Sequence, residues 1–256
     1  MTITRLLAVA SAALLVPTLD AKTLFVASNG PLTSIQDPID LADADDTIVL
    51  KAGIYVETLR ILGKDGLELR GVGSVIVDGR ELGSGGDGPA ITIEAALQSV
   101  VTDNRVKIGS AAGIRIGAGS GSTPVARNVA QRCSNEGAAG FDLHRDDVTM
   151  FDNLAKDNVR HSLCVLRVGC DIECFTSTRN LRDGIRLEST ASGTRLTDAL
   201  VPKNGEHGIA NLANGVELRI AVLLANRLDL ANDGTFAVLD QVQFQSGGAN
   251  VDVEPN

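Results

Sequence analysis

Residues 139–145 read AGFDLHR, residues 161–167 read HSLCVLR, residues 183–189 read DGIRLES and residues 207–213 read HGIANLA. In each segment a small residue is followed by apolar residues at alternate positions, which is the period-two pattern of a β-strand. The segments begin 22, 22 and 24 residues apart, so one short structural unit recurs along the chain. Such a repeat is typical of a solenoid, in which each unit packs only on its neighbours.

Asparagine recurs with the same period. Spacings of 23, 22, 24, 22 and 24 residues separate Asn135, Asn158, Asn180, Asn204, Asn226 and Asn250. Asparagine tolerates a left-handed bend and can bond the neighbouring backbone, so stacked asparagines predict a ladder. We therefore predict an all-β fold, a single-stranded right-handed parallel β-helix of about nine coils of ~23 residues. A leucine-rich-repeat solenoid is disfavoured because the L-x-x-L-x-L-x-x-N frame is missing.

The segment from Thr23 to about Tyr55 predicts a cap at the start of the β-helix. The apolar residues of Ile35–Ala44 have helical spacing, Thr47–Leu50 is expected to be a strand, and Gly53 a turn. A short helical N-terminal cap before the first coil resembles the start of many pectin-lyase-like β-helices.

Domain organisation is simple. Met1–Ala21 has the basic start, the short apolar run Leu6–Val16 and the polar exit of a signal peptide, so we expect a secreted or periplasmic protein. Residues 22–256 show no linker, and we expect one β-helix domain. The glycine-rich stretches Gly83–Gly88 and Gly117–Gly121 break the period and predict loops that leave the cylinder.

Composition limits the classes of partner. The chain has 256 residues, of which 44% are hydrophobic and only 3% aromatic, and its formal net charge is −9. We do not expect so acidic a chain to bind nucleic acid, because the phosphates of nucleic acid require basic partners. No internal run of 18 apolar residues exists, so we expect no membrane span in the mature chain.

The charge is unevenly distributed. Between Arg127 and Arg195 there are ten basic and ten acidic residues, so the rest of the chain carries the whole negative excess. An arginine-rich, locally neutral strip can receive an acidic polysaccharide, because guanidinium pairs bidentately with carboxylate. The alternative is a lattice of surface salt bridges that binds nothing.

The cysteines match no known metal pattern. Their spacing fits neither a zinc nor a haem motif, and no two of them occupy equivalent positions on adjacent coils. We therefore expect buried thiols at Cys133, Cys164, Cys170 and Cys174.

Counting from the small residue that opens each repeat assigns side chains to faces of the cylinder. The flanking positions Phe141 and Leu143 are apolar and expected in the core, so Asp142 and His144 are expected to face outward side by side. The second position along holds, in order, Asp142, Cys164, Arg186 and Ala210. The position before the small residue holds, in order, Ala139, His161, Asp183 and His207. All three histidines thus fall near one strip, unless they are ordinary polar turn residues.

The segment AGFDLHRDD, residues 139–147, resembles the Tyr-Gly-Phe-Asp-Pro-His motif of mannuronan C5-epimerases. The segments that follow, VTMFDNLAKDN and RHSLCVLRVGC, are also similar, because a basic residue and a histidine precede another basic residue one coil later. The resemblance covers about Val125 to Gly215. It implies a β-helical enzyme that removes H5 of mannuronate in alginate and returns a proton from the opposite face, giving guluronate.

The same resemblance implies roles for individual residues. Asp142 and His144 match the motif's Asp and His, so His144 would transfer a proton and Asp142 would orient it or contact the sugar. Arg160 and Arg167 match basic positions that could neutralise the substrate carboxylate, and His161 matches the paired histidine. The catalytic candidates are His144, Asp142, His161 and Arg167, and the substrate-binding candidates are Arg160, Arg145, Asp183, Arg186 and His207.

Departures from the motif keep other functions open. The motif's Tyr is Ala139 here and its Pro is Leu143, while the only tyrosine is Tyr55 in the cap. His161, one coil from Ala139, is a hypothetical replacement for the missing tyrosine.

A polyuronate lyase of the same fold is one alternative, since it also begins by removing H5. A non-catalytic β-helix that binds carbohydrate or assembles on a surface is the other. No metal site is assigned, and Ca²⁺ is the one candidate cofactor, with Asp142, Asp146 and Asp147 as the carboxylates that could contribute.

Overall fold

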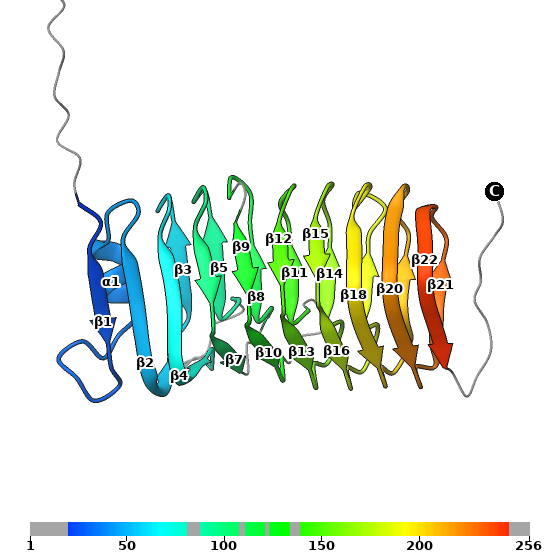
Figure 1. Cartoon of the computed structure of the whole chain (residues 1–256). Helices are drawn as coiled ribbons and strands as arrows, with labels where there is room; N and C mark the ends of the chain where they lie inside the picture. The colour runs from blue at the N-terminus through cyan, green and yellow to red at the C-terminus, as the bar shows by residue number, and fades with distance from the viewer. Residues whose placement is uncertain (1–19, 81–87, 108–110, 121–122, 134–138, 246–256) are drawn as a thin grey trace, which may run out of the picture.

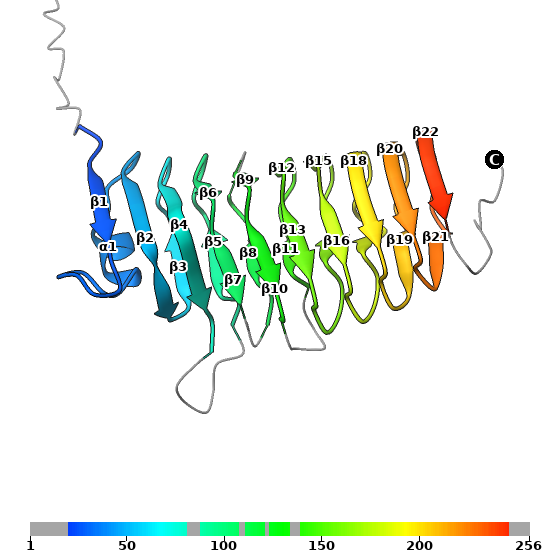
Figure 2. The ribbon, with the colours of Figure 1, turned by 60° about the horizontal axis from the view of Figure 1, so that its bottom comes forward.

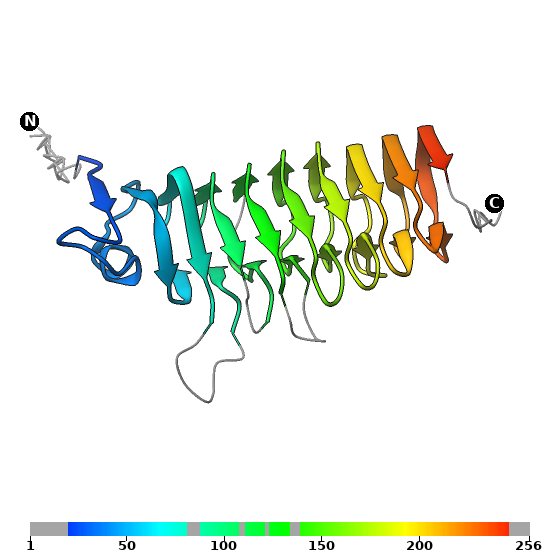
Figure 3. The same cartoon turned by 90° about the horizontal axis from the view of Figure 1, so that it is seen from below.

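The computed structural model describes residues 20–80, 88–107, 111–120, 123–133 and 139–245. Nearly all of the expected signal peptide Met1–Ala21 lies outside the described residues, as do Asn135, Asn250 and most of Gly83–Gly88. The chain winds in successive coils along one axis, with the cap at one end (Figures 1 and 2). All strand pairs are parallel, and the view in Figure 3 shows the strands of successive coils side by side. The predicted parallel β-helix is confirmed.

The strands form two sheets, which we call sheet A and sheet B. In the described part of the chain sheet B has eight strands, which come from successive coils: β3 (Leu59–Leu62), β5 (Ile91–Glu94), β8 (Ile114–Ile116), β11 (Phe141–Leu143), β14 (Leu163–Val165), β17 (Ile185–Leu187), β19 (His207–Asn211) and β21 (Leu228–Asn232).

Sheet A is larger and contains the strands of the remaining faces. Its strands are β1 (Thr23–Val26), β2 (Thr47–Val56), β4 (Glu68–Asp78), β6 (Val100–Thr102), β7 (Arg105–Lys107), β9 (Pro124–Ala126), β10 (Val129–Gln131), β12 (Thr149–Phe151), β13 (Leu154–Lys156), β15 (Asp171–Glu173), β16 (Thr176–Thr178), β18 (Arg195–Pro202), β20 (Val216–Leu224) and β22 (Phe236–Gln245). The helix α1 (Gln36–Leu41) belongs to the cap.

The core is a stack of aliphatic layers, as the alternation of apolar residues predicts. Phe141, Leu143, Ile185 and Leu187 are completely buried. The large side chain of Phe175 enters the same core, where its ring meets Phe141 edge to face at 5.8 Å between centroids. Because alternate residues of each short strand point inward, the intervening ones form the outer surface of the sheet.

Asparagines form two ladders inside the corners of sheet A. In the predicted ladder, the backbone nitrogens of Asn158, Asn180 and Asn204 each donate to the side-chain oxygen of the next asparagine, at 3.1, 3.2 and 2.8 Å. Within the described part of the chain, Asn226 is the last residue of this ladder. At its start, the backbone nitrogen of Cys133 donates to Asn158 Oδ1 at 3.0 Å. Cys133 therefore holds the ladder position that the spacing assigned to Asn135.

The second ladder was not predicted. The backbone nitrogen of Asn104 donates to Asn128 Oδ1, and that of Asn128 donates to Asn153 Oδ1, each at 3.0 Å. In the next coil the equivalent position is Phe175, which follows the left-handed residue Cys174 (φ 53°), as Asn153 follows Asp152 (φ 52°). The ladder thus gives way to an apolar residue in the middle of the molecule.

Two local expectations were wrong. Gly53 lies inside strand β2, where the register shifts between Lys51 and Gly53, so the glycine accommodates a bulge instead of a turn. Residues 117–120 stay on the cylinder, because the backbone nitrogen of Gly117 donates to the oxygen of Ile93 in the coil before. No helix in the described part of the chain is long and apolar enough to cross a membrane.

Candidate functional site

The outer surface of sheet B holds the chemistry-bearing residues. The pairing of β8, β11, β14, β17 and β19 places in one row Arg115, Asp142, Cys164, Arg186 and Ala210. The register from Asp142 to Ala210 is the one that the repeat predicts. Adjacent strands are about 4.8 Å apart, so each side chain in the row can contact its neighbours.

Arg115, Asp142 and His144 form the first centre on this surface. Arg115 Nη2 lies 3.2 Å from Asp142 Oδ2, and His144 Nε2 lies 4.0 Å from the same oxygen. The backbone nitrogen of Ala139 donates to Asp142 Oδ1 at 3.4 Å. Asp142 is only 4% exposed, so the carboxylate that was expected to face outward is covered by its partners. The accessible groups of this centre are His144 and Arg115, whose side chains are 38% and 32% exposed.

Burial and neighbouring charge set the protonation of this centre. Burial lowers the pKa of His144, and the cations Arg115 and Arg167 lower it further, although Asp142 acts in the opposite direction. Burial also raises the pKa of Asp142. A histidine whose pKa is lowered is neutral at pH 7, so His144 is suited to accept a proton.

His161, Asp183 and His207 form a row on successive coils, as the repeat predicts. His207 Nδ1 lies 2.7 Å from Asp183 Oδ1, and His161 Nδ1 lies 3.2 Å from Asp183 Oδ2. The backbone nitrogens of His207 and Asp183 add contacts to Asp183 Oδ1 at 3.2 Å and to His161 Nδ1 at 3.3 Å. His161 Nδ1 faces both the backbone N–H and the carboxylate of Asp183, and it can accept from the first or donate to the second but not do both at once. The charge-assisted bond to the carboxylate is the stronger of the two.

Accessibility separates the two histidines of this row. The side chain of His161 is 4% exposed and that of Asp183 is 1% exposed, whereas His207 is 32% exposed. Burial disfavours the ionised form of Asp183, but the hydrogen bonds from His161 and His207 outweigh it and hold its pKa below the usual range. The hydrogen bond to Asp183 raises the pKa of His207.

Arg186 completes a second centre with Asp183 and His207. Arg186 Nη1 lies 3.4 Å from Asp183 Oδ2, and Arg186 Nε donates to Glu188 Oε1 at 2.7 Å. The side chain of Arg186 is 29% exposed, close to the 32% of Arg115 in the first centre. The surface of sheet B thus carries two sets of a buried aspartate flanked by an accessible arginine and an accessible histidine.

The other arginines predicted for the site lie around these centres. Arg167 is exposed at the end of β14, and its charge acts on His144. Arg160 is half-buried just before β14, and its charge acts on Cys164. Arg145 is half-buried in the turn after β11, and its Nε has no partner among the described residues.

Arg115 was not among the residues predicted from the sequence. It lies two residues after Gly113 in the segment GIRIG, the same place that Arg186 occupies after Gly184 in GIRLES. The repeat therefore contained the signal that could have identified it. Its pairing with Asp142 follows from the stacking of β8 on β11.

Cys164 lies in the row between Asp142 and Arg186. Burial, with the charges of Asp142 and Glu188, raises the pKa of its thiol to about 12. Burial likewise raises the pKa of Cys170 to about 11. Both groups are therefore protonated thiols at neutral pH, and neither is suited to act as a nucleophile. Cys133 and Cys170 are buried, as expected, whereas Cys164 and Cys174 are partly exposed.

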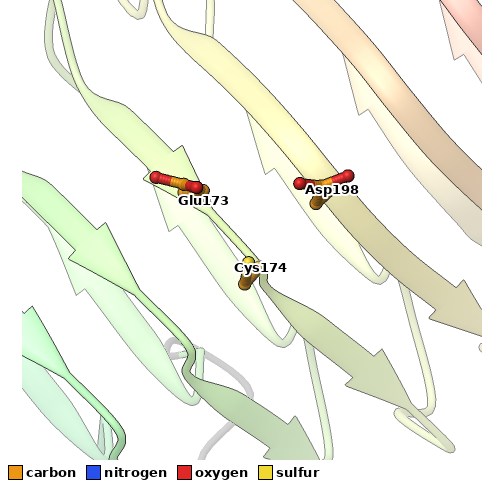
Figure 4. A group of neighbouring side chains, drawn as sticks. All are labelled: Glu173, Cys174 and Asp198. Atoms are coloured by element: carbon orange, nitrogen blue, oxygen red, sulfur yellow. The ribbon is translucent and has the colours of Figure 1, made fainter.

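Two groups of potential metal ligands occur in the described parts of the chain. One is Asp183, Glu206 and His207, within the second centre. The other is Glu173, Cys174 and Asp198, at the surface of sheet A where β15 and β18 are neighbouring strands (Figure 4). The trio considered for Ca²⁺, which was Asp142, Asp146 and Asp147, forms no such group, and Asp146 Oδ1 instead accepts the backbone N–H of Val168 at 3.3 Å.

A cavity of about 260 Å³ lies away from the histidines, on the side of β4, β7 and β10. It is lined in part by Asp103, Asn104 and Arg127. Arg127 and Asp103 form a bidentate pair there, with two contacts of 2.8 Å. This cavity therefore belongs to a different face from the two centres.

Solved structures of other proteins share the fold of this chain. Pectate lyase Pel9A has a TM-score of 0.61 and 14% identity, with 91% of this chain and 78% of that chain covered. A rhamnogalacturonan lyase has a TM-score of 0.61 and 13% identity, with coverage of 80% and 70%. Pectin methylesterase PemA from Erwinia chrysanthemi has a TM-score of 0.59 and 13% identity, with 92% of both chains covered. No protein-family model matches the chain, and no curated protein matches its sequence. The likeness to these enzymes therefore shows that the chain has their parallel β-helix fold.

Proposed function

We propose that this chain acts on an acidic polysaccharide at the outer surface of sheet B, as an enzyme of the mannuronan C5-epimerase type. The observation that carries the proposal is the first centre. It combines an accessible histidine with a lowered pKa, a buried aspartate and arginines on both sides. Removal of a proton next to a carboxylate requires this combination of a neutral base and a cation.

In the proposed reaction His144 accepts H5 of a uronate residue through Nδ1, because Nε2 is the nitrogen that faces Asp142. The electron pair of the broken C–H bond moves into the neighbouring carboxylate, which a cation must stabilise. Arg115 and Arg167 are the cations whose charge reaches His144, so they are the proposed neutralising groups. Asp142 holds Arg115 and faces His144, and it is proposed to orient both.

The burial of His161 changes its proposed role. With a side chain that is 4% exposed and an Nδ1 that faces Asp183, His161 does not reach a sugar on the surface of the sheet. We therefore propose that His161 does not replace the missing tyrosine. Water on the solvent side of the sugar is proposed to return the proton. His161 supports Asp183 instead.

The fold of the neighbours supports the class of substrate. The similar structures are described as a pectate lyase, a rhamnogalacturonan lyase and a pectin methylesterase, so enzymes that act on polysaccharides share this framework. The outward row of sheet B from Arg115 to Ala210 contains no aromatic ring, which favours charge as the means of recognition there. Export through the signal peptide Met1–Ala21 is part of the proposal, since such polymers lie outside the cell.

Proton NMR of poly-mannuronate incubated with the protein in D₂O tests the proposal, with and without Ca²⁺. Guluronate signals with deuterium at C5 are the expected result. His144→Gln is expected to lower the rate by about 10²–10⁴-fold, the usual contribution of a general base. The matched control Arg179→Gln removes an exposed charge that pairs with Asp157 on sheet A, and it is expected to keep full activity.

The other outcomes identify the alternatives. Olefinic signals would show elimination, and the protein would then be a lyase. An unchanged spectrum from folded protein would exclude both reactions and leave a carbohydrate-binding β-helix.

A further inference from the structure

The two centres on sheet B have the same composition but different electrostatics. Asp142 and Asp183 are both buried, and each lies between an arginine and an accessible histidine. Only Asp183 receives a second histidine, because His161 contacts its other oxygen. The pKa of His144 is lowered by burial, whereas the pKa of His207 is raised by its bond to Asp183. At any given pH the second centre therefore carries the larger protonated fraction of histidine.

The contacts of Asp183 leave one side of His207 available. Asp183 Oδ1 accepts from the backbone nitrogen and Nδ1 of His207, and Oδ2 lies near His161 and Arg186. No hydrogen bond to His207 Nε2 occurs among the described residues. With Nδ1 fixed on the carboxylate, protonated His207 points an Nε2–H donor away from Asp183.

Two carboxylates and one guanidinium act on His207. Asp183 and Glu206 favour its protonated form, while Arg186 disfavours it. Glu206 itself lies 3.7 Å from Arg182, and on the next coil the residue paired with His207 is the uncharged Leu228. The protonated His207 ring is therefore the cation of this centre whose outward nitrogen, Nε2, has no hydrogen-bonded carboxylate among the described residues.

The two centres are separated along the axis and also along the strands of sheet B. Strand β19 lies three steps of the sheet from β11, about 14 Å along the axis. His207 also lies five residues before Leu212, the residue in register with His144, which adds about 16 Å along the strand direction. A linked pyranose residue advances a polysaccharide by a length close to one step, so a chain that crosses the sheet obliquely from a uronate at His144 brings another carboxylate to His207 about four residues further along.

We propose that Arg186, Asp183 and His207 form a second, carboxylate-binding subsite for a uronate about four residues from the one at His144. This inference rests on the proposed function and adds to it a minimum substrate length and a distinct anchoring cation. Protonated His207 donates Nε2–H to the carboxylate, Arg186 adds its charge, and Asp183 with His161 fixes the ring. No bond is made or broken at this subsite.

Calorimetric titration of the whole protein with hexamannuronate and dimannuronate at pH 6 tests the subsite. His207→Gln, which keeps a hydrogen-bond donor but loses the charge, is expected to bind the hexasaccharide about tenfold more weakly. Its affinity for the disaccharide is expected to stay unchanged, because two residues do not span both centres. The control Lys203→Gln removes an exposed cation at a corner of sheet A and is expected to change neither affinity.

A second measurement does not depend on the variant folding. In the wild-type protein, saturating hexamannuronate is expected to raise the pKa of His207, followed by NMR of its ring nitrogens, because the ligand prefers the protonated form. An unchanged pKa under saturation, or equal hexasaccharide affinity of wild type and His207→Gln, overturns the subsite but leaves the proposed function intact. A wild-type protein that binds no hexamannuronate overturns both.

A metal ion is the competing occupant, since Asp183, Glu206 and His207 also form a potential ligand group. Titration with Zn²⁺ alone distinguishes the two. Zn²⁺ binding that His207→Gln abolishes, together with weaker hexasaccharide binding in the presence of Zn²⁺, would contradict the anion subsite. Hexasaccharide binding that is unaffected by a chelator supports it.

Discussion

At the scale of single residues, burial decides which members of a polar cluster can act. Asp142, His161 and Asp183 are all on the outer side of sheet B, yet their neighbours cover them. The accessible groups are His144 and His207, and their environments shift the two pKa values in opposite directions. Two histidines on one surface therefore have different protonation at the same pH, and they take different roles in the proposed function.

The raised pKa of His207 makes the stability of the protein depend on pH. A group whose pKa is higher in the folded state stabilises the fold fully below its unfolded pKa, about 6.5 for histidine, and loses that effect as pH rises through the folded value. Asp183 keeps a lowered pKa and stays ionised over this range. We expect wild type to exceed His207→Gln in free energy of unfolding at pH 6 and the difference to be smaller at pH 9.

Urea denaturation of both proteins at each pH measures this difference. The same comparison for Lys203→Gln, an exposed corner residue, should show no dependence on pH in the same interval. A difference between wild type and His207→Gln that grows with pH would contradict the assignment.

At the scale of elements, the corners of the coils are stabilised by buried amides. Asn180 is 2% exposed, and its Oδ1 accepts from the backbone nitrogen and Nδ2 of Asn158 at 3.1 and 2.9 Å. Asn104, at the start of the other ladder, is equally buried, but its Oδ1 has no partner within the described residues. The same side chain therefore has different energetic importance inside a ladder and at its end.

We expect Asn180→Ala to lower the free energy of unfolding by about 2–4 kcal/mol, because two buried donors of Asn158 lose their acceptor. Asn104→Ala leaves no buried donor without an acceptor, and it is expected to lower the free energy of unfolding by about 1–2 kcal/mol. Chemical denaturation of both variants measures the difference. Equal losses would mean that the ladder oxygen contributes nothing beyond packing.

At the scale of the whole molecule, the β-helix is a one-dimensional stack. Between its edge strands β3 and β21, each strand of sheet B pairs with the strands of the preceding and following coils, and the apolar core runs through all of them. In such an architecture stability is the sum of terms from each coil and from the contacts between neighbours. The middle coils contain the large rings of Phe141 and Phe175, and Phe175 takes the position that asparagine holds in the coils of the second ladder.

Replacement of Phe175 by alanine should therefore act locally. The side chain is completely buried, and its loss is expected to cost about 3–5 kcal/mol. Hydrogen exchange should show lost protection in the coils of β13 to β18 and retained protection in β2 to β5. Phe151→Ala, at a site that is 42% exposed, is the control and should change little. A uniform loss of protection along the chain would mean that the coils unfold as one unit.

Much of the fold follows from the sequence because its determinants are local. A period of 22 to 24 residues fixes one coil, and alternation within three-residue strands fixes which side chains enter the core. The register of Asp142, Cys164 and Arg186 follows from the same repeat. The place of Gly53 does not, since a bulge depends on how β2 pairs with β4.

The sequence by itself determined the parallel β-helix, its core positions and the gathering of the histidines on one surface, because each depends only on the repeat. Only the tertiary structure decided which of these residues are accessible, that Arg115 pairs with Asp142, and that both histidines beside Asp183 approach its carboxylate through Nδ1. Those properties depend on side-chain contacts between coils. Burial and charge act across the stack, between residues that are more than 20 positions apart in the chain.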